Sequence, residues 1–162
     1  QCLVGSEMCI RDRMNTSLAN MAGISNGKVI DTDKEYAVAE EYRKKLKTKC
    51  PTVEQNVGNL SGGNQQKVLL AKWMFAEPDI LILDEPTRGI DVGAKYEIYC
   101  IINDLVAAGK SVIMISSELP EVLGMSDRIY IMNEGRFVGE VSGEEATSEL
   151  IMSKIVKSGK GE

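Results

Sequence analysis

Hydrophobic positions recur along the chain with two different periods, and the alternation of these periods predicts alternating helices and strands. Apolar residues spaced as on one face of a helix predict helices, whereas short continuous apolar runs bounded by polar residues predict buried strands. The predicted helices cover residues 33–49, 64–77, 92–108, 119–123 and 144–157, and the predicted strands cover residues 80–83, 111–115, 128–132 and 137–141. Because uninterrupted apolar strands are typical of parallel sheets covered on both faces, this order predicts an α/β fold.

Glycine-rich and polar stretches separate these elements. Gly109 is placed to end the helix before it, and residues 133–136 predict a hairpin turn. Residues 15–33 are rich in Asn, Ser and Gly and predict mostly loop. Trp73 and Phe75 are predicted to lie in the core. Residues 1–13 show neither period and resemble an adapter-derived peptide found at the ends of unrelated assembled sequences, so we expect this segment to be non-native.

The composition excludes several classes of function. The formal net charge is −5 with acids and bases mixed, and the absence of a basic stripe argues against binding to nucleic acid. No apolar run approaches the roughly 20 residues that span a bilayer, so membrane association is expected to go through a protein partner. The four cysteines have no ligand-like spacing and the chain has no histidine, which predicts reduced thiols of a cytosolic protein and no zinc site.

A pair of glycines lies where a predicted loop becomes a helix, within the string LSGGNQQ at residues 60–66. Two such glycines cost helix stability of about 1 kcal/mol each relative to alanine, which indicates that the backbone must approach something closely. Ser61 can act as the N-cap, and the free N–H groups of the first helical turn suit a phosphate. A flexible Gly-Gly loop is the alternative interpretation of the three residues SGG alone.

Two acids, Asp84 and Glu85, directly follow the predicted strand at 80–83. The carboxyl ends of parallel strands are where open α/β sheets bind ligands. Together with residues 60–66, the string ILILDEPT at 80–87 resembles ATP-binding cassettes. LSGGNQQ resembles their signature motif, and ILILDEPT resembles their Walker B strand with its trailing glutamate.

This resemblance implies a role for each residue of the two motifs, with ATP and Mg²⁺ as cofactors. Asp84 is implied to order Mg²⁺ through water, and Glu85 to orient or deprotonate the attacking water. Asp91 occupies the D-loop position, which in the family crosses a dimer interface, and it can also cap the helix that follows. The residues implied to contact nucleotide are Leu60, Ser61, Gly62, Gly63, Asn64, Gln65 and Asp91.

One residue departs from the family pattern. After the strand at 111–115, family members usually carry a histidine that contacts the γ-phosphate, whereas Ser117 stands at that position here. A serine hydroxyl can donate one hydrogen bond but carries no positive charge near neutral pH, so weaker stabilisation of developing negative charge is expected. Ser117 is therefore a candidate catalytic residue that replaces the histidine, and its alternative role is to cap the helix carrying Pro120.

Three further strings, at residues 63–67, 87–99 and 116–124, narrow the resemblance to one subfamily. They are similar to the second cassette of the double-cassette ATPases of bacterial monosaccharide importers, of the xylose, galactose, ribose and multiple-sugar type. This implies head-to-tail pairing with a first cassette, a membrane permease as partner and, indirectly, a periplasmic or extracellular sugar-binding protein. It also implies a peripheral location at the cytoplasmic face of the cell membrane.

No Gly-x-x-x-x-Gly-Lys-Ser/Thr loop occurs in the sequence, so we expect a fragment: the distal half of a P-loop NTPase-like ATP-binding cassette. The expected parts are part of the helical signature subdomain at residues 14–76, the C-terminal part of the nucleotide-binding core at 77–143, and a C-terminal helix and tail at 144–162. Two alternatives stay open. The chain could be a non-catalytic fragment that only completes a partner cassette's ATP site, or it could belong to a non-transport cassette protein of DNA repair or translation.

Overall fold

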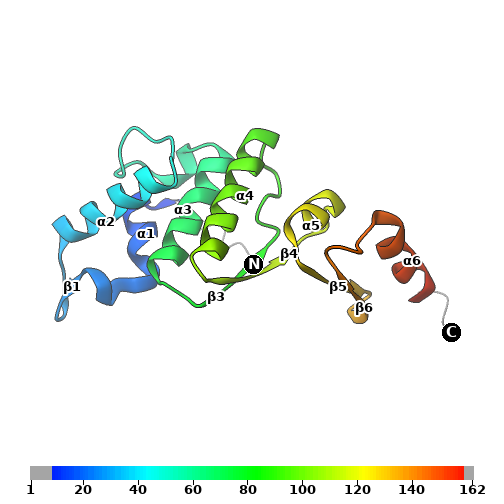
Figure 1. Cartoon of the computed structure of the whole chain (residues 1–162). Coiled ribbons are helices and arrows are strands. Elements are labelled where there is room, and N and C mark those ends of the chain that lie inside the picture. Colours follow the sequence, from blue (N-terminus) through cyan, green and yellow to red (C-terminus); the bar gives the residue numbers. More distant parts are fainter. Residues whose placement is uncertain (1–8, 159–162) are drawn as a thin grey trace. The chain divides into compact units, whose positions relative to one another are not determined.

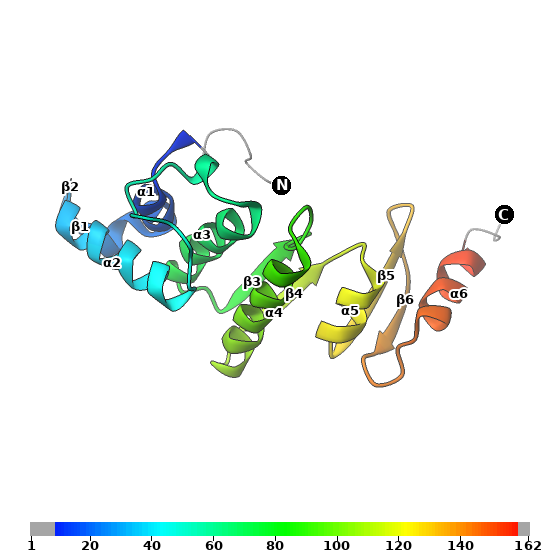
Figure 2. The same ribbon diagram turned by 90° about the horizontal axis from the view of Figure 1, so that it is seen from above.

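The structure, a computed structural model, describes residues 9–158 and divides into two compact units. The first unit ends at Ile113 and the second begins at Met114, so that the boundary falls within one strand. Figures 1 and 2 show helices and strands alternating from β3 to β5, as the hydrophobic pattern predicts. The α/β class expected from the sequence is therefore confirmed.

The first unit contains four α-helices among its described residues, together with two short 3-10 helices and two small sheets. Its elements are α1 (Asp12–Ser17), η2 (Leu18–Ile24), β1 (Ser25–Asn26), β2 (Val29–Ile30), α2 (Thr32–Lys45), η3 (Val57–Asn59), α3 (Gly62–Phe75), β3 (Ile80–Asp84), α4 (Val92–Ala107) and β4 (Ser111–Ile115), the last crossing into the second unit. β1 and β2 pair antiparallel, and β3 and β4 are neighbours in a second sheet. Gly109 has φ 86° just beyond α4, which confirms its predicted role at the helix end.

Residues 15–33 are not the loop that their composition predicts. They form the end of α1, the whole of η2 and the β1–β2 hairpin. Apart from Ile24, which is fully buried, the buried side chains here are polar: the Ser17 hydroxyl donates to a Glu35 carboxylate oxygen at 2.8 Å, and the Thr16 hydroxyl donates to Asp12 at 3.2 Å. Asn15, Thr16 and Ser17 are each at most 4% exposed. A hydropathy pattern cannot reveal an interface that is held by hydrogen bonds between polar side chains.

The segment before Met14 also packs against the first unit where it is described. The backbone N–H groups of Asp12 and Arg13 donate to the carbonyl oxygens of Gln55 and Val53, both at 3.0 Å. The lack of an apolar period in residues 1–13 therefore does not mean that residues 12–13 make no contacts with the rest of the unit. Residues 1–8 lie outside the described part, and the non-native origin of the segment stays a prediction.

Strand β3 buries one face and exposes the other. Leu81 and Leu83 are 8% and 7% exposed, whereas Ile80 and Ile82 are 59% and 64% exposed. The prediction that this strand is covered on both faces is therefore wrong for the described chain, because no described element covers the side that carries the two isoleucines. Trp73 is also more exposed, at 43%, than its predicted place in the core requires.

The second unit packs a β-hairpin against two helices. Its elements are α5 (Leu119–Met125), β5 (Arg128–Asn133), β6 (Arg136–Ser142) and α6 (Ser148–Ser158). The predicted turn is confirmed, with Glu134 and Gly135 both at positive φ between antiparallel strands. The core contains side chains from both strands and from α6: Ile129, Ile131, Val141 and Ile151. α6 begins four residues later than predicted, where the Thr147 hydroxyl accepts the Leu150 N–H at 3.1 Å.

Three cysteines lie among the described residues, and all three are free thiols, as predicted. Cys50 is buried, and burial together with the neighbouring Asp12 carboxylate raises the pKa of its thiol to about 11. A thiol with such a pKa is almost entirely protonated near neutral pH and is a poor nucleophile. Cys2 lies outside the described residues.

Candidate functional site

The signature string forms the first turn of α3. Ser61 occupies the N-cap position with φ −63° and ψ 154°, and Gly62 is the first helical residue. The Ser61 hydroxyl makes no capping bond to the backbone; it accepts a hydrogen bond from the Asn64 amide at 2.8 Å. Ser61 and Gly62 are exposed, and the first N–H groups of any helix lack intrahelical partners. The turn therefore offers an open helix N-terminus suited to an anion.

The other residues of the string hold this turn in place. Leu60 is 8% exposed and packs in a cluster with Cys50, Val57 and Val68. Gln65 donates from its side-chain amide to the Leu60 carbonyl oxygen at 2.9 Å, and Asn64 accepts the Lys49 N–H at 2.8 Å. Since the Leu60 side chain is in the core, only its backbone is placed to face a ligand.

The two glycines have different surroundings. A Cβ atom on Gly63 would overlap the Cβ of Ala94 on α4, whereas a Cβ on Gly62 would lie 3.3 Å from the Ile90 Cγ2. Gly63 is buried, so its small size serves the close packing of α3 on α4. The prediction from sequence explained both glycines by the close approach of a bound anion to the backbone. For Gly63 the structure shows a second reason, which is helix packing.

The two candidate acids lie at the end of β3 and in the turn beyond it. Asp84 is the last strand residue and is exposed. Glu85 is half-buried and has φ 49°, in the left-handed region that few non-glycine residues adopt. Thr87, 1% exposed, fixes the following turn in the core. A strained backbone at the start of such a turn is typical of functional positions.

Asp91 caps α4. Its carboxylate accepts the Ala94 N–H at 2.9 Å, and Asp91 itself lies at the N-cap position. The capping role foreseen for Asp91 is thus confirmed, whereas its contact with nucleotide is untested. Because Ala94 also packs on Gly63, the signature turn and the Asp91 turn lie close together within the first unit.

Ser117 lies in the second unit, whereas the other candidate residues lie in the first. α5 has Glu118 at its N-cap, and the Ser116 hydroxyl accepts the Glu118 N–H at 3.0 Å and donates to the Glu121 carboxylate. The alternative interpretation of Ser117 as the N-cap of this helix is wrong, because Glu118 occupies that position. Ser117 is exposed.

The carboxylates at the end of β3 suit a metal ion only when a nucleotide supplies further ligands. Within residues 9–158, no group of three or more His, Cys, Asp or Glu side chains could hold a metal ion. Asp84 and Glu85 supply two carboxylates. Mg²⁺ in nucleotide sites is held by one or two carboxylates together with substrate phosphates and water, so this pair fits a nucleotide-bound Mg²⁺ and not a site built by protein alone.

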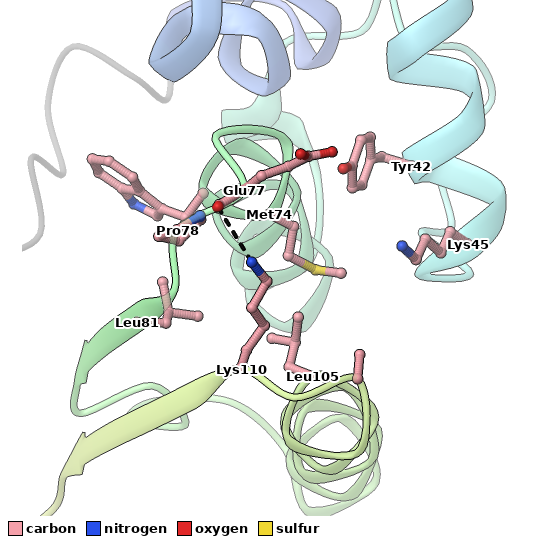
Figure 3. A pocket seen from close by; sticks show the side chains of 10 residues that line it. Tyr42, Lys45, Met74, Glu77, Pro78, Leu81, Leu105 and Lys110 are labelled. Atoms are coloured by element: carbon pink, nitrogen blue, oxygen red, sulfur yellow. Dashed lines mark hydrogen bonds between the residues drawn. The ribbon is translucent and has the colours of Figure 1, made fainter.

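A cavity of about 230 Å³ lies elsewhere in the first unit (Figure 3). It is lined by side chains from α2, from the C-terminal ends of α3 and α4, from β3, and from the residues just before β3 and β4: Tyr42, Lys45, Trp73, Met74, Glu77, Pro78, Leu81, Leu105, Ala108 and Lys110. The Lys110 ammonium donates to the Glu77 carbonyl oxygen at 3.4 Å. None of the candidate site residues lines this cavity.

The family of the chain follows from its similarity to known proteins. The family model described as ABC transporter matches residues 5–88, just over half of the 162 residues, and the chain belongs to this family. The chain is 62% identical to the L-arabinose transport ATP-binding protein AraG of Geobacillus stearothermophilus over 146 residues, which cover 90% of this chain and 28% of that protein.

Two further relatives are also named as ATP-binding proteins of sugar import. The chain is 58% identical to the xylose import ATP-binding protein XylG of Geobacillus kaustophilus, covering 86% of this chain and 28% of that protein. It is 54% identical to the ribose import ATP-binding protein RbsA of Clostridium tetani, covering 88% and 28%. The chain thus spans little more than a quarter of the length of the curated relatives it matches.

Solved structures share the fold. A nucleotide-free ATP-binding cassette of an ABC transporter superposes with a TM-score of 0.74 at 21% identity, covering 96% of this chain and 65% of that one. An ATP-binding cassette in its ADP conformation superposes with a TM-score of 0.72 at 22% identity, again covering 96% and 65%. The prediction of a partial cassette fold is thereby confirmed.

No described helix is long and apolar enough to cross a membrane.

Proposed function

We propose that this chain is part of the second cassette of an importer ATPase and couples ATP binding and hydrolysis to the uptake of a monosaccharide. The observation that carries the proposal is the exposed signature turn at the N-terminus of α3, packed against the Asp91 turn. The relatives, named for the transport or import of L-arabinose, xylose and ribose, support the substrate class.

The proposed roles divide between two ATP molecules. Ser61, Gly62 and Gly63 present N–H groups to the phosphates of an ATP held by the partner cassette, where an open helix N-terminus stabilises negative charge. Asp84 orders a Mg²⁺ ion, which would neutralise phosphate charge when bound, and Glu85 orients the attacking water. Phosphoryl transfer depends chiefly on such positioning and charge stabilisation, so these few groups are sufficient for a role in catalysis.

The proposed partners are a first cassette, with which this one pairs head to tail, and a membrane permease. A periplasmic or extracellular sugar-binding protein takes part through the permease. The proposed location is peripheral, at the cytoplasmic face of the membrane. A cassette of DNA repair or translation is the weaker alternative, because the chain is acidic and its similar relatives are named for sugar transport.

The chain by itself is expected to show no measurable ATP turnover, because its sequence contains no loop that wraps the β- and γ-phosphates. Phosphate release from a clean preparation of the 162-residue chain is the measurement. The matched control is the Glu85→Gln variant of the same chain. Turnover that disappears in this variant would show that the chain alone is catalytic.

Glu85→Gln is expected to reduce sugar uptake and ATP turnover of the full-length protein less than the corresponding change in its first cassette. Glu85 serves the site that has Ser117 in place of a histidine, so this substitution disables a site that is already poor at hydrolysis. The measurement is the steady-state ATPase rate of the reconstituted importer, with Ser117→His as the matched variant that should raise turnover at this site. Equal and complete loss from both glutamine variants would contradict the asymmetry.

A further inference from the structure

Lys67 is a buried cation that the candidate site does not use. Its side chain is 2% exposed and lies on α3, directly after the signature string at residues 60–66. A buried ammonium is costly unless it is paired and hydrogen-bonded. The Lys67 Nζ lies 2.7 Å from the Glu97 Oε2 on α4, and it donates to the Lys47 carbonyl oxygen at 3.2 Å. One side chain therefore joins α3 to two other segments.

The ion pair continues a contact that begins at the signature. Gly63 and Lys67 are four residues apart on α3, and Ala94 and Glu97 are three residues apart on α4, so each pair shares a helix face. Gly63 packs directly on Ala94, and one turn further Lys67 meets Glu97. Figure 1 shows α3 and α4 side by side. The two helices are thus fixed at two successive points just behind the signature turn.

The third segment is the loop that follows α2. The Lys47 backbone is left-handed, with φ 52°, and its carbonyl oxygen accepts the Lys67 ammonium. Two residues later, the Lys49 N–H donates to the Asn64 side chain at 2.8 Å. The same loop is therefore anchored twice to the first turns of α3.

We propose that Lys67 is a positioning residue, which holds the signature turn and the Asp91 turn as one rigid body so that both are oriented before ATP arrives. This inference rests on the proposed function. Removing the ammonium leaves fewer molecules with both turns in the binding geometry. Apparent affinity falls in proportion to that fraction, so the KM for ATP should rise while kcat at saturating ATP changes less.

The test uses the full-length protein assembled with its permease and compares Lys67→Met, Lys67→Arg, Glu97→Gln and the Lys67→Met/Glu97→Gln double variant. The readouts are KM and kcat for ATP, and hydrogen exchange in peptides that cover residues 58–66 and 87–95. Lys67→Met should raise the KM about tenfold and speed exchange in both peptides. Lys67→Arg should restore both readouts to within about twofold, because arginine keeps the charge and its donors.

Glu97→Gln removes the charge that pairs with Lys67 but leaves a side-chain amide oxygen that can still accept a hydrogen bond from the Lys67 ammonium, at a position that is 47% exposed. It should change both readouts in the same direction as Lys67→Met but less, and the double variant should be no worse than Lys67→Met alone. Unchanged exchange in Lys67→Met overturns the proposal. Faster exchange with an unchanged KM also overturns it, since Lys67 would then stabilise the fold without positioning the site.

A wild-type protein without ATPase activity would refute the proposed function instead. The exchange data still decide the inference in that case. Faster exchange in both peptides for Lys67→Met, together with wild-type exchange in Lys67→Arg, would support the proposed positioning role of Lys67. Wild-type exchange rates in Lys67→Met would exclude it.

Discussion

Replacing Gly62 with aspartate is expected to reduce ATP turnover of the full-length protein, assembled with the permease that we propose as its partner, by about 100-fold. Gly62 is exposed at the first position of α3, where N–H groups face outward. A carboxylate there would repel the γ-phosphate of the ATP that we propose binds against this turn. The measurement is the steady-state ATPase rate of the reconstituted importer.

Two matched variants separate charge from size at the same position. Gly62→Asn is nearly isosteric with the aspartate variant and should retain more turnover. Gly62→Ala should retain most, because a Cβ there would lie 3.3 Å from the Ile90 Cγ2, a side-chain atom that can shift slightly, and 3.7 Å from the Gly89 carbonyl oxygen. An acidic side chain at a helix N-terminus favours the helix, so Gly62→Asp should not lower the melting temperature. Full activity in Gly62→Asp would exclude a phosphate at this turn.

Gly63→Ala is expected to lower the thermal midpoint of the same protein by a few degrees. The new Cβ would overlap the Cβ of Ala94, and overpacking of this kind costs about 1–3 kcal/mol. The better helix propensity of alanine offsets about 1 kcal/mol of that cost. The measurement is the melting temperature, with ATP turnover recorded on the same samples.

Ala94→Gly supplies the test of mechanism for this prediction. It removes the atom that the new Cβ would strike, so Gly63→Ala should cost less in the Ala94→Gly background than in the wild type. A double-mutant cycle isolates this coupling from the helix propensities of the two residues. Additive effects would mean that the overlap with Ala94 is relieved in some other way, and would remove helix packing as the reason for Gly63.

The part of the fold that follows Ile80 could be predicted from hydrophobic spacing, because each element there has an apolar face at its own period. The helix that ends before Gly109 and the hairpin turn at Glu134 and Gly135 lie where the sequence placed them. The region around Ser17 could not be predicted, because its buried contact to Glu35 is a hydrogen bond between polar side chains. Hydropathy assigns such residues to the surface.

The sequence motifs of the candidate site could be predicted, but the contacts between its residues could not. The strings at residues 60–66 and 80–87 identify the family, yet neither string reveals that Gly63 rests on Ala94 or that Lys67 reaches Glu97. Those partners lie about 30 residues away along the chain, and single-sequence spacing carries no information on such pairs.

At Glu85, protein stability and the proposed catalytic role have opposite requirements, because its backbone is left-handed. Glycine would adopt φ 49° without steric cost, whereas a side chain there carries strain of order 1 kcal/mol. A search for stabilising substitutions would therefore tend to select Glu85→Gly, and it would remove the carboxylate that we propose orients water. Thermostability engineering of this protein should accordingly hold position 85 fixed and look for gains elsewhere.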